Sequence, residues 1–341
     1  MNAAAQILLF KPYQLKRLEA KNFRRRRCVG RVLHLGGGVQ STTLAYMAVE
    51  GELKIDLALF ADTGDEPFWV YQTVGRVRSL LAARGIPLVM TMRRCGYRRW
   101  FIASPDAPRA SMPLWVKTPG KTRPGRLLRQ CTQELKITPN ERYLKAWLIA
   151  RGLIQLPPGF SYHNGYLWNR QSRLEARDWP RLAVPRDVFI ETLFGISSDE
   201  SSRAKERGPR WQQTRYPLIE LGMSRQDCVA WLEAHGYAVP FKSACIQCPY
   251  RSDEAWLWMQ QRFPDEFEEA CRYDDWLRTP AAKQSGPYSR IRGEMYIHRT
   301  CLPLREVNFA ALMIGRSKAT SEFELELLQT CSSDGGFSCM S

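Results

Sequence analysis

The sequence lacks any apolar run that approaches the roughly 18 to 20 residues needed for a membrane-spanning helix. Its N-terminal apolar stretch, Ala3 to Phe10, is too short to span a membrane and lacks the basic start of a secretory signal peptide. With 44% hydrophobic residues in a chain of 341, the protein can still bury a full core. These features predict a globular cytoplasmic protein with no membrane partner.

Histidine is also scarce. The four histidines include no pair at helical spacing, so the sequence offers no histidine zinc site and no support for a Ser-His-Asp triad. His34 falls inside a predicted strand, where a histidine usually belongs to the core. His298 lies close to Cys301, and metal binding is the alternative interpretation for it.

Acidic residues are few relative to basic ones: 34 Asp and Glu stand against 50 Lys and Arg, which gives a formal net charge of +16 and a pI near 9.6. Residues 11–27 hold eight Lys or Arg against Glu19 alone. Such a field favours polyanions, and aromatic residues among the charges suit stacking on unpaired bases. A second basic tract and its aromatic residues comprise Arg93, Arg94, Tyr97, Arg98, Arg99, Trp100, Phe101, Arg109, Trp115, Lys117, Lys121, Arg123, Arg126 and Arg129. These basic residues predict a tRNA or DNA partner. The alternatives are a solubilising surface and an arginine-rich leader that resembles a transit peptide.

The most informative stretch present is a glycine run after a short apolar strand. Val32 to Leu35 reads as a strand, and Gly36, Gly37 and Gly38 follow it, with Ser41 and Thr42 at the opening of a helix. Glycines let the backbone turn so that several N–H groups face one point, and a helix N-terminus attracts anions. The pattern predicts a phosphate cradle at the carboxyl end of a strand.

A second apolar run, Ile55 to Phe60, reads as a buried parallel strand and leads into Asp62-Thr63-Gly64. Ligands of open α/β sheets bind outside the carboxyl ends of neighbouring strands. The two motifs together predict a nucleotide site. The spacing does not match a Walker A loop, because no Gly-Lys-Ser or Gly-Lys-Thr follows the first glycine at the required distance.

Strand and helix patterns alternate from Val29 onward, which predicts an α/β fold with a doubly wound parallel sheet. Residues 1–28 are expected to form a basic flexible extension, residues 29–240 the nucleotide-binding domain, and residues 241–341 a cysteine-containing, mostly helical extension. Prolines between Ser104 and Arg126 predict a long loop near the site.

The glycine run resembles the PP-loop of the adenine nucleotide alpha hydrolase superfamily, whose usual form is Ser-Gly-Gly-x-Asp-Ser, although Gly36 replaces the first serine and Gln40 the aspartate. The Asp-Thr-Gly segment resembles the phosphoadenosine phosphosulfate (PAPS) reductase group, including divergent members from phages and mobile elements. The resemblance implies a HUP-like fold and an adenine nucleotide, ATP or PAPS, with Mg²⁺. The residues that it assigns to nucleotide and Mg²⁺ binding are Gly36, Gly37, Gly38, Gln40, Ser41, Thr42, Asp62, Thr63, Gly64 and Glu66, with Asp62 and Glu66 holding Mg²⁺ or orienting the ribose.

Three basic residues occur in segments that resemble the same group. Arg129 and Lys136 belong to an Arg-x-Cys-Thr, Leu-Lys, Pro pattern, and Arg203 ends a Gly, Glu-Ser, Arg segment that begins at Gly195. The resemblance implies that these three cations, with Ser41, act on the phosphate or sulfate during transfer. A solvated helix face for Lys136 and a simple helix N-cap at residues 197–200 are the structural alternatives.

Cys245 and Cys248 form a C-x-x-C, which can place two thiolates on one metal ion or form a redox pair. Candidates for the other ligands are Cys301, Cys131 and the pair Cys331 and Cys339. Related sulfur-handling enzymes imply a [4Fe-4S] cluster or Zn²⁺ at such a set. Unliganded thiols remain the third interpretation.

These observations favour an enzyme that cleaves ATP between the α and β phosphates, adenylates a nucleic acid and supports sulfur transfer to it, with a sulfur donor protein as a possible partner. A PAPS or adenosine phosphosulfate (APS) reductase releasing sulfite is the first alternative, but the chain contains no Glu-Cys-Gly-Ile/Leu-His motif. The second alternative is a nucleotide-binding or nucleic-acid-binding module without catalysis.

Overall fold

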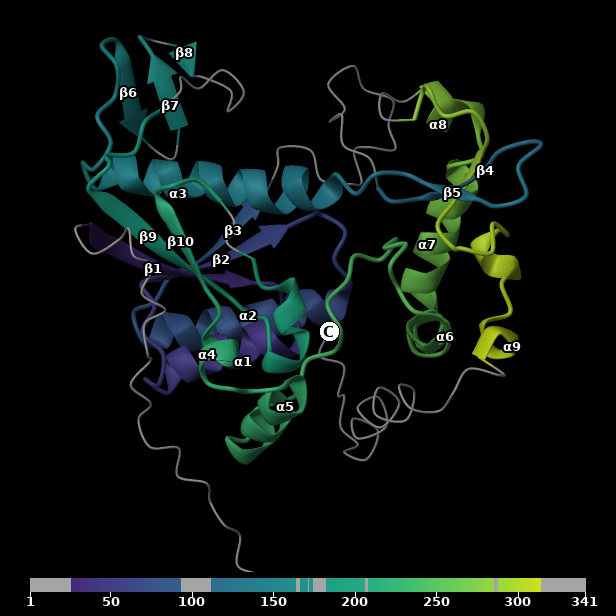
Figure 1. Cartoon of the computed structure of the whole chain (residues 1–341), viewed down its shortest axis with the longest axis horizontal. Helices are drawn as coiled ribbons and strands as arrows, with labels where there is room; N and C mark the ends of the chain where they lie inside the picture. Colours follow the sequence, from purple (N-terminus) through teal and green to yellow (C-terminus); the bar gives the residue numbers. More distant parts are fainter. Residues whose placement is uncertain are drawn as a thin grey trace, which may run out of the picture. The chain divides into compact units, whose positions relative to one another are not determined.

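The computed structural model describes residues 26–92, 112–163, 166–170, 172–173, 182–205, 208–284 and 288–313 (Figure 1). These residues fall into two compact units. The first contains the described residues within 26–62, 68–92 and 135–243, and the second those within 63–67, 112–134 and 244–313. The predicted N-terminal extension up to residue 25, the basic and aromatic residues at 93–109, and Cys331 and Cys339 lie outside the described residues.

The first unit is built on a five-stranded sheet in which every strand is parallel to its neighbours. The order β10-β9-β1-β2-β3 places β1 between a strand that follows it in sequence and one that comes much later. Such a reversal of strand order is the topological switch point where ligands of doubly wound folds bind. The strands are β1 (Arg27–Leu35), β2 (Leu57–Asp62), β3 (Leu88–Met92), β9 (Val188–Phe194) and β10 (Gln212–Arg215).

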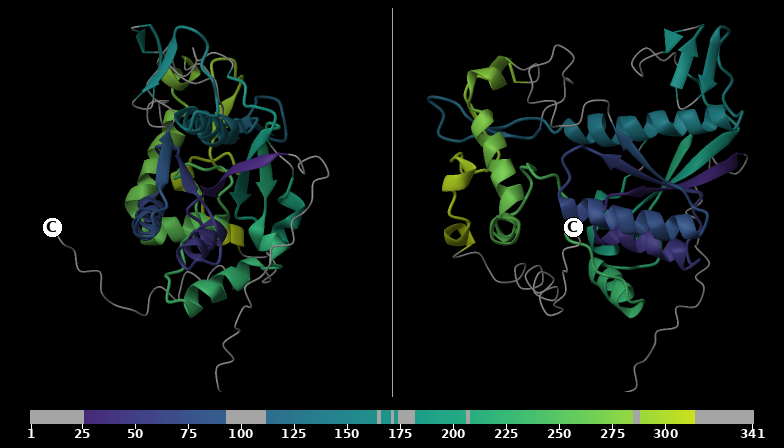
Figure 2. Two further views of the ribbon diagram at one scale, coloured as in Figure 1. Left: turned by 90° about the vertical axis from the view of Figure 1, so that its left-hand side faces the viewer. Right: turned by 180° about the vertical axis from the view of Figure 1, so that it is seen from behind.

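Helices cover both faces of this sheet. The helices α1 (Val39–Val49) and α2 (Phe68–Ala83) lie on one face and α3 (Thr138–Ala150) on the other (Figures 1 and 2). Apolar side chains of α3 join the strands in one core, and Gly30 of β1 leaves room for Trp147, whose ring would lie 2.4 Å from a Cβ at that position. The predicted doubly wound α/β fold is confirmed.

Smaller elements complete the first unit. An antiparallel sheet comprises β6 (Phe160–His163), β7 (Tyr166–Asn169) and β8 (Ser172–Arg173), while α4 (Pro217–Glu220) and α5 (Arg225–Ala234) follow β10. Ser224 and Asp227 form a capping box at the start of α5. None of the helices in the described part of the chain is long and apolar enough to cross a membrane.

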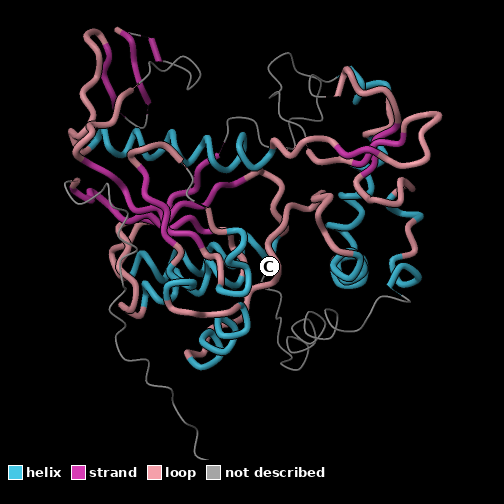
Figure 3. The backbone as a smooth tube through the Cα atoms, in the orientation of Figure 1, coloured by secondary structure: helices cyan, strands magenta, loops and turns pink. Residues whose placement is uncertain are grey.

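The second unit combines a small sheet with helices. The sheet has the order β11-β4-β5 and is antiparallel (Figure 3). Its strands are β4 (Trp115–Lys117), β5 (Gly125–Arg126) and β11 (Glu294–Tyr296), and its helices are α6 (Asp253–Arg262), α7 (Pro264–Trp276), α8 (Pro280–Gln284) and α9 (Phe309–Met313).

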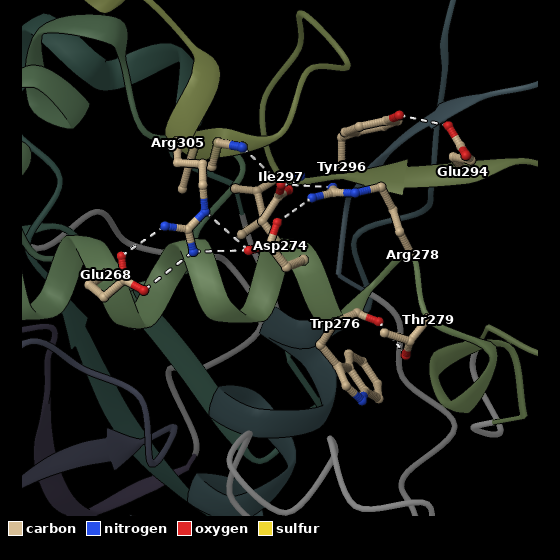
Figure 4. A network of polar contacts seen from close by, with 11 residues as sticks. Glu268, Asp274, Trp276, Arg278, Thr279, Glu294, Tyr296, Ile297 and Arg305 are labelled. Carbon is tan, nitrogen blue, oxygen red and sulfur yellow. Dashed lines mark hydrogen bonds and ion pairs between the residues drawn. The ribbon is translucent and has the colours of Figure 1, made fainter.

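Asp274 of α7 fixes the segment that carries β11. Its fully buried carboxylate accepts hydrogen bonds from the N–H groups of Ile297 at 2.7 Å and Leu304 at 2.9 Å, and it pairs with Arg278 at 2.8 Å (Figure 4). Burial raises the pKa of Asp274, although the two N–H donors and Arg278 act in the opposite direction. The network therefore anchors β11 to α7.

Two features differ from the sequence predictions. The first strand begins at Arg27 instead of Val32, so the predicted start is wrong and residues 27 and 28 belong to the sheet. Pairing with β9 supports this early part, and a register shift between Cys28 and Gly30 hides the regular alternation that sequence analysis relies on.

The proline-rich segment is not wholly loop, since residues 115–126 contain the hairpin of β4 and β5. Residues 112–134 also group with the C-terminal unit, whereas the predicted division at residue 240 kept them with the nucleotide domain. The pairing of β4 with β11 explains this grouping, because it joins segments almost 180 residues apart in sequence.

Candidate nucleotide site and cysteine cluster

The loop between β1 and α1 is tied to the first turn of its own helix. The N–H of Gly36 donates to Ser41 Oγ at 3.0 Å, and Ser41 Oγ donates to the Gly38 carbonyl at 3.2 Å. Gly37 has φ +75°, and a Cβ there would lie 2.9 Å from Val70, so only glycine suits this position. Ser243 donates to the Gly36 carbonyl from the end of the unit. These bonds give the predicted loop one defined shape.

The N-terminus of α1 carries no side-chain cap. Gly38 is the N-cap residue, no side chain bonds to the first N–H groups, and the first turn has no acidic residue. Thr42 is fully buried, and its hydroxyl has no hydrogen-bond partner among the residues that the structure describes. An uncapped helix start with its positive dipole end favours an anion.

Gly195 brings the end of β9 against this loop. A Cβ at Gly195 would lie 2.6 Å from the backbone nitrogen of Ser41 and 2.9 Å from the carbonyl carbon of Gln40. Any side chain here would displace the loop backbone. The sequence identifies Gly195 only as the start of the segment that ends at Arg203, because no local pattern predicts a contact between residues 154 positions apart.

Gln40 links the loop to the 3₁₀ helix Ser198–Arg203, which follows β9. Its amide nitrogen donates to Glu200 Oε2 at 3.1 Å and lies 3.4 Å from Ser197 Oγ. Arg203, predicted to face phosphate, is 65% exposed and pairs with the other Glu200 oxygen at 2.7 Å. Through Gln40, a carboxylate is therefore held at the first turn of α1.

Charged groups around the same strand ends are held in place. Asp62 closes β2, is buried, and accepts a hydrogen bond from Tyr71 at 2.8 Å. Burial of Asp199 acts to raise the pKa of its carboxyl, but hydrogen bonds from Ser197 and from the Arg225 N–H reverse the sign and lower it. Lys136 lies half-buried in the π-helix Thr132–Ile137 that precedes α3.

His34 lies in β1, as predicted, but it is half-buried, and its Nε2 has no hydrogen-bond partner among the residues that the structure describes. Its ring stacks on Phe194 at 4.5 Å, and its Nδ1 lies 3.0 Å from the Asn140 amide nitrogen. Burial lowers the pKa of His34 to about 4, so the ring is neutral at pH 7.

The second unit gathers the rest of the Asp-Thr-Gly motif and the C-x-x-C. Thr63 Oγ1 donates to Glu66 Oε1 at 3.1 Å, and Cys245 Sγ lies 3.6 Å from the same oxygen and 3.4 Å from the Thr63 hydroxyl. Gly64 has φ +76° in the turn between Thr63 and Glu66. Asp65 adds two contacts, since its carbonyl accepts from Ile246 N–H at 2.9 Å and its carboxylate from Gln247 at 3.0 Å.

A buried guanidinium supports this cluster. Arg251 is 7% exposed and donates to the carbonyls of Ala244 at 3.2 Å and Cys245 at 3.0 Å, and it stacks on Trp256. Burial lowers the pKa of Arg251, while the thiols and the carboxylates of Asp65 and Glu66 act to raise it. Its positive charge favours thiolates at the C-x-x-C turn.

The cysteines of the predicted metal set have different surroundings. Burial raises the pKa of Cys248, Cys131 acts in the same direction, and the cations of Arg251 and Arg129 oppose it. Cys301 is buried, and the charges that act on its thiol are those of Lys117 and Asp274. Among the described residues, no three His, Cys, Asp or Glu side chains converge as metal ligands. The predicted metal site at the cysteines stays a prediction.

No protein-family profile and no curated protein sequence matches this chain. Among solved structures, the U34-tRNA thiolase NcsA from Methanococcus maripaludis, solved with its [4Fe-4S] cluster, is similar with a TM-score of 0.32. The match has 12% sequence identity and covers 78% of this chain and 72% of that chain.

Proposed function

We propose that the β1–α1 loop binds the phosphates of an adenine nucleotide, and that the protein is a PP-loop enzyme of the PAPS reductase-like type. The observation that carries this proposal is the uncapped start of α1 at the switch point of the sheet, where Gly195 allows β9 to approach the Ser41 nitrogen. A glycine loop, free helix amides and a switch point are three independent marks of phosphate binding.

The favoured reaction is ATP-dependent adenylation. An acceptor oxygen attacks the α-phosphorus of ATP, pyrophosphate leaves, and a sulfur nucleophile then displaces AMP from the activated acceptor. The Gly36–Ser41 loop holds the phosphates, because its amides are preorganised toward negative charge. Asp62 and Glu200 are the carboxylates of the first unit that we propose for Mg²⁺ carried by ATP, and Glu66 keeps its sequence-based assignment as a prediction.

Three basic residues keep their proposed roles as charge partners. Lys136 and Arg203 belong to the first unit and Arg129 to the second. Because Arg203 already pairs with Glu200 at 2.7 Å, we propose that it reaches phosphate by exchanging that carboxylate for the nucleotide. Its 65% exposure leaves room for the movement.

Calorimetry with ATP and Mg²⁺ against PAPS tests the nucleotide. Ser41→Ala removes the hydroxyl that joins Gly36 to Gly38, so we expect ATP binding to weaken and pyrophosphate release to fall by about two orders of magnitude or more. Ser79→Ala is the matched control, since Ser79 bonds only to the Gly75 carbonyl on the surface of α2.

The alternatives give different results in the same experiment. A preference for PAPS with release of sulfite would replace adenylation by the reductase reaction. Binding of ATP without pyrophosphate release, under every acceptor tested, would indicate a binding module. Equal ATP affinity in wild type and Ser41→Ala would contradict the loop as the phosphate site.

A further inference from the structure

The hairpin of β4 and β5 carries a group of cations and aromatic rings in the second unit. We define the hairpin surface as Trp115, Lys121, Arg123, Arg126, Arg129 and Tyr250. Residues 112–133 contain basic residues but no Asp or Glu. Lys121, Arg123, Arg126 and Arg129 are exposed and have no carboxylate partner among the residues that the structure describes. Their charge is therefore available to an external anion.

Arginine and aromatic side chains pack together on this surface. Arg126 lies opposite Trp115 in the strand pairing, and its guanidinium is 5.5 Å from the Trp115 ring centroid and 5.2 Å from that of Tyr250. Arg129 lies 5.1 Å from the same Tyr250 ring. Two like charges beside one ring repel each other, and a bound phosphate would relieve that repulsion.

Apolar faces remain open beside the cations. Tyr250 is 46% exposed and Leu128 is 78% exposed. An exposed aromatic ring beside guanidinium groups provides a stacking surface for a base next to charges that neutralise its phosphates. A duplex hides its base faces, so this combination suits unpaired nucleotides.

The scaffold beneath the hairpin is rigid. The β11 strand pairs with β4, and Gly293 lies so close to the hairpin that a Cβ there would be 2.6 Å from the Lys117 carbonyl. Asp274 holds the β11 segment through two N–H donors (Figure 4). The nearby acid Glu294 accepts a hydrogen bond from Tyr296 at 2.7 Å. These contacts fix the backbone that carries Trp115 and Arg126.

The surface continues into the cysteine cluster of the same unit. Arg129 lies two residues before Cys131, and Tyr250 lies two residues after Cys248. The charges of Arg129 and Cys131 both act on the Cys248 thiol.

We propose that the hairpin surface binds single-stranded nucleic acid, with Tyr250 and Trp115 as base-stacking residues and the four cations on phosphates. This proposal deepens the proposed function, because it names the surface for the nucleic-acid acceptor. It can be tested separately, because binding to the hairpin surface needs no adenine nucleotide.

The experiment measures fluorescence anisotropy of labelled 12-nucleotide RNA and DNA strands of one sequence, and of the DNA duplex, on the full chain without nucleotide. The first variant, Lys121→Gln with Arg123→Gln and Arg126→Gln, should weaken binding of single strands about ten-fold or more. Its slope of log affinity against log salt should fall in magnitude by about 2, since each phosphate that a cation neutralises adds about 0.7 to the slope. The matched control, Lys54→Gln with Arg76→Gln and Arg78→Gln, removes three exposed charges of the first unit and should bind as wild type does.

The second variant tests stacking. Tyr250→Ala should weaken single-strand binding about five-fold or more and leave duplex binding unchanged. Phe68→Ala removes another exposed ring, 42% exposed, and is the control. The RNA and DNA arms identify the preferred sugar, and either preference supports the surface. Circular dichroism confirms that each variant is folded.

Equal affinity of the hairpin variant and its charge control would overturn the proposal, and so would equal loss for duplex and single strand in Tyr250→Ala. Ser41→Ala should retain wild-type affinity for the strands. If ATP binding fails while the hairpin results hold, the proposed function is wrong and the nucleic-acid surface stands. If ATP binds the loop but the hairpin variants bind single strands as wild type does, the nucleic-acid surface is wrong and the proposed function stands.

Discussion

The two units offer anions two different kinds of site. The Gly36–Thr42 loop of the first unit has no cationic side chain and presents helix amides, whereas the hairpin surface of the second unit presents four exposed cations. The first unit also pairs its strand arginines: Arg31 and Arg215 both contact Glu191, at 3.1 and 3.3 Å. Amides at fixed positions select one phosphate group by geometry, while free cations attract any polyanion. The net charge of +16 therefore does not by itself tell how either site would bind an anion.

The largest expected effect is a loss of nucleotide affinity caused by a substitution that distorts the loop and leaves the hairpin surface unchanged. Gly195→Ala places a Cβ 2.6 Å from the Ser41 nitrogen, so the loop backbone must move. We expect nucleotide affinity to fall about 1,000-fold, the upper range for losing preorganised phosphate donors, while single-strand affinity stays at the wild-type value. Calorimetry and anisotropy measure the two, and retained ATP affinity would show that β9 does not shape the loop.

The next effect concerns pH and one histidine in each unit. His34 has no carboxylate partner among the described residues and a pKa of about 4, whereas His298 lies 2.9 Å from Asp253, which opposes the lowering of its pKa by burial. Because the unfolded chain protonates His34 near pH 6.5, the stability that neutral His34 confers is full above that pH and is lost as pH falls toward 4.

His34→Gln should flatten this dependence. A shift from 6.5 to about 4 corresponds to at most about 3 kcal/mol in the free energy of unfolding across the window. Urea unfolding at half-unit steps from about pH 4 to 7 measures the slope. The same slope in wild type and variant would mean that His34 is not the titrating group.

Salt separates the two kinds of site in the wild-type protein. With four phosphate contacts at about 0.7 each, raising NaCl from about 50 to 200 mM should weaken single-strand binding about 50-fold. ATP affinity at constant Mg²⁺ should change less than about five-fold, because no side-chain cation occurs in the loop. If ATP affinity and single-strand affinity fell equally with salt, the loop and the hairpin surface would not differ in how they bind anions.

The smallest effect is expected for Gly75→Ala, which is the matched control for Gly195→Ala. Gly75 lies within α2, and a Cβ there would meet nothing within 4 Å. Gly75→Ala should raise the free energy of unfolding by about 0.5 to 1 kcal/mol, because alanine restricts the unfolded chain and favours helix. Both ligand affinities should stay constant, and chemical denaturation with both binding assays checks this.

Local pattern was sufficient for much of the first unit. The apolar runs before Gly36 and before Asp62 are neighbouring strands of the sheet, as predicted. These features depend on residues within a few positions of one another. The early start of β1 at Arg27 was missed because its support is the distant strand β9 and its alternation is broken at Gly30.

The candidate sites show the same division. Glycines, Ser41 and Thr42 could be selected from the sequence, because a phosphate loop and the helix after it are contiguous. The roles of Gly195 and Glu200 could not, since each meets the loop from more than 150 residues away. For the hairpin, the basic residues and Trp115 were visible, but prolines indicated loop, and Tyr250 entered only through its contact with Arg126.

By itself the sequence determined the α/β class, the order of strands and helices around the glycine loop, the excess of positive charge and the C-x-x-C, because each follows from residue type and short-range periodicity. Only the tertiary structure decided which carboxylate reaches Gln40 and that residues 112–134 fold with the C-terminal unit. Those outcomes depend on contacts between distant segments, whose geometry is set by strand pairing and packing, and no local pattern encodes them.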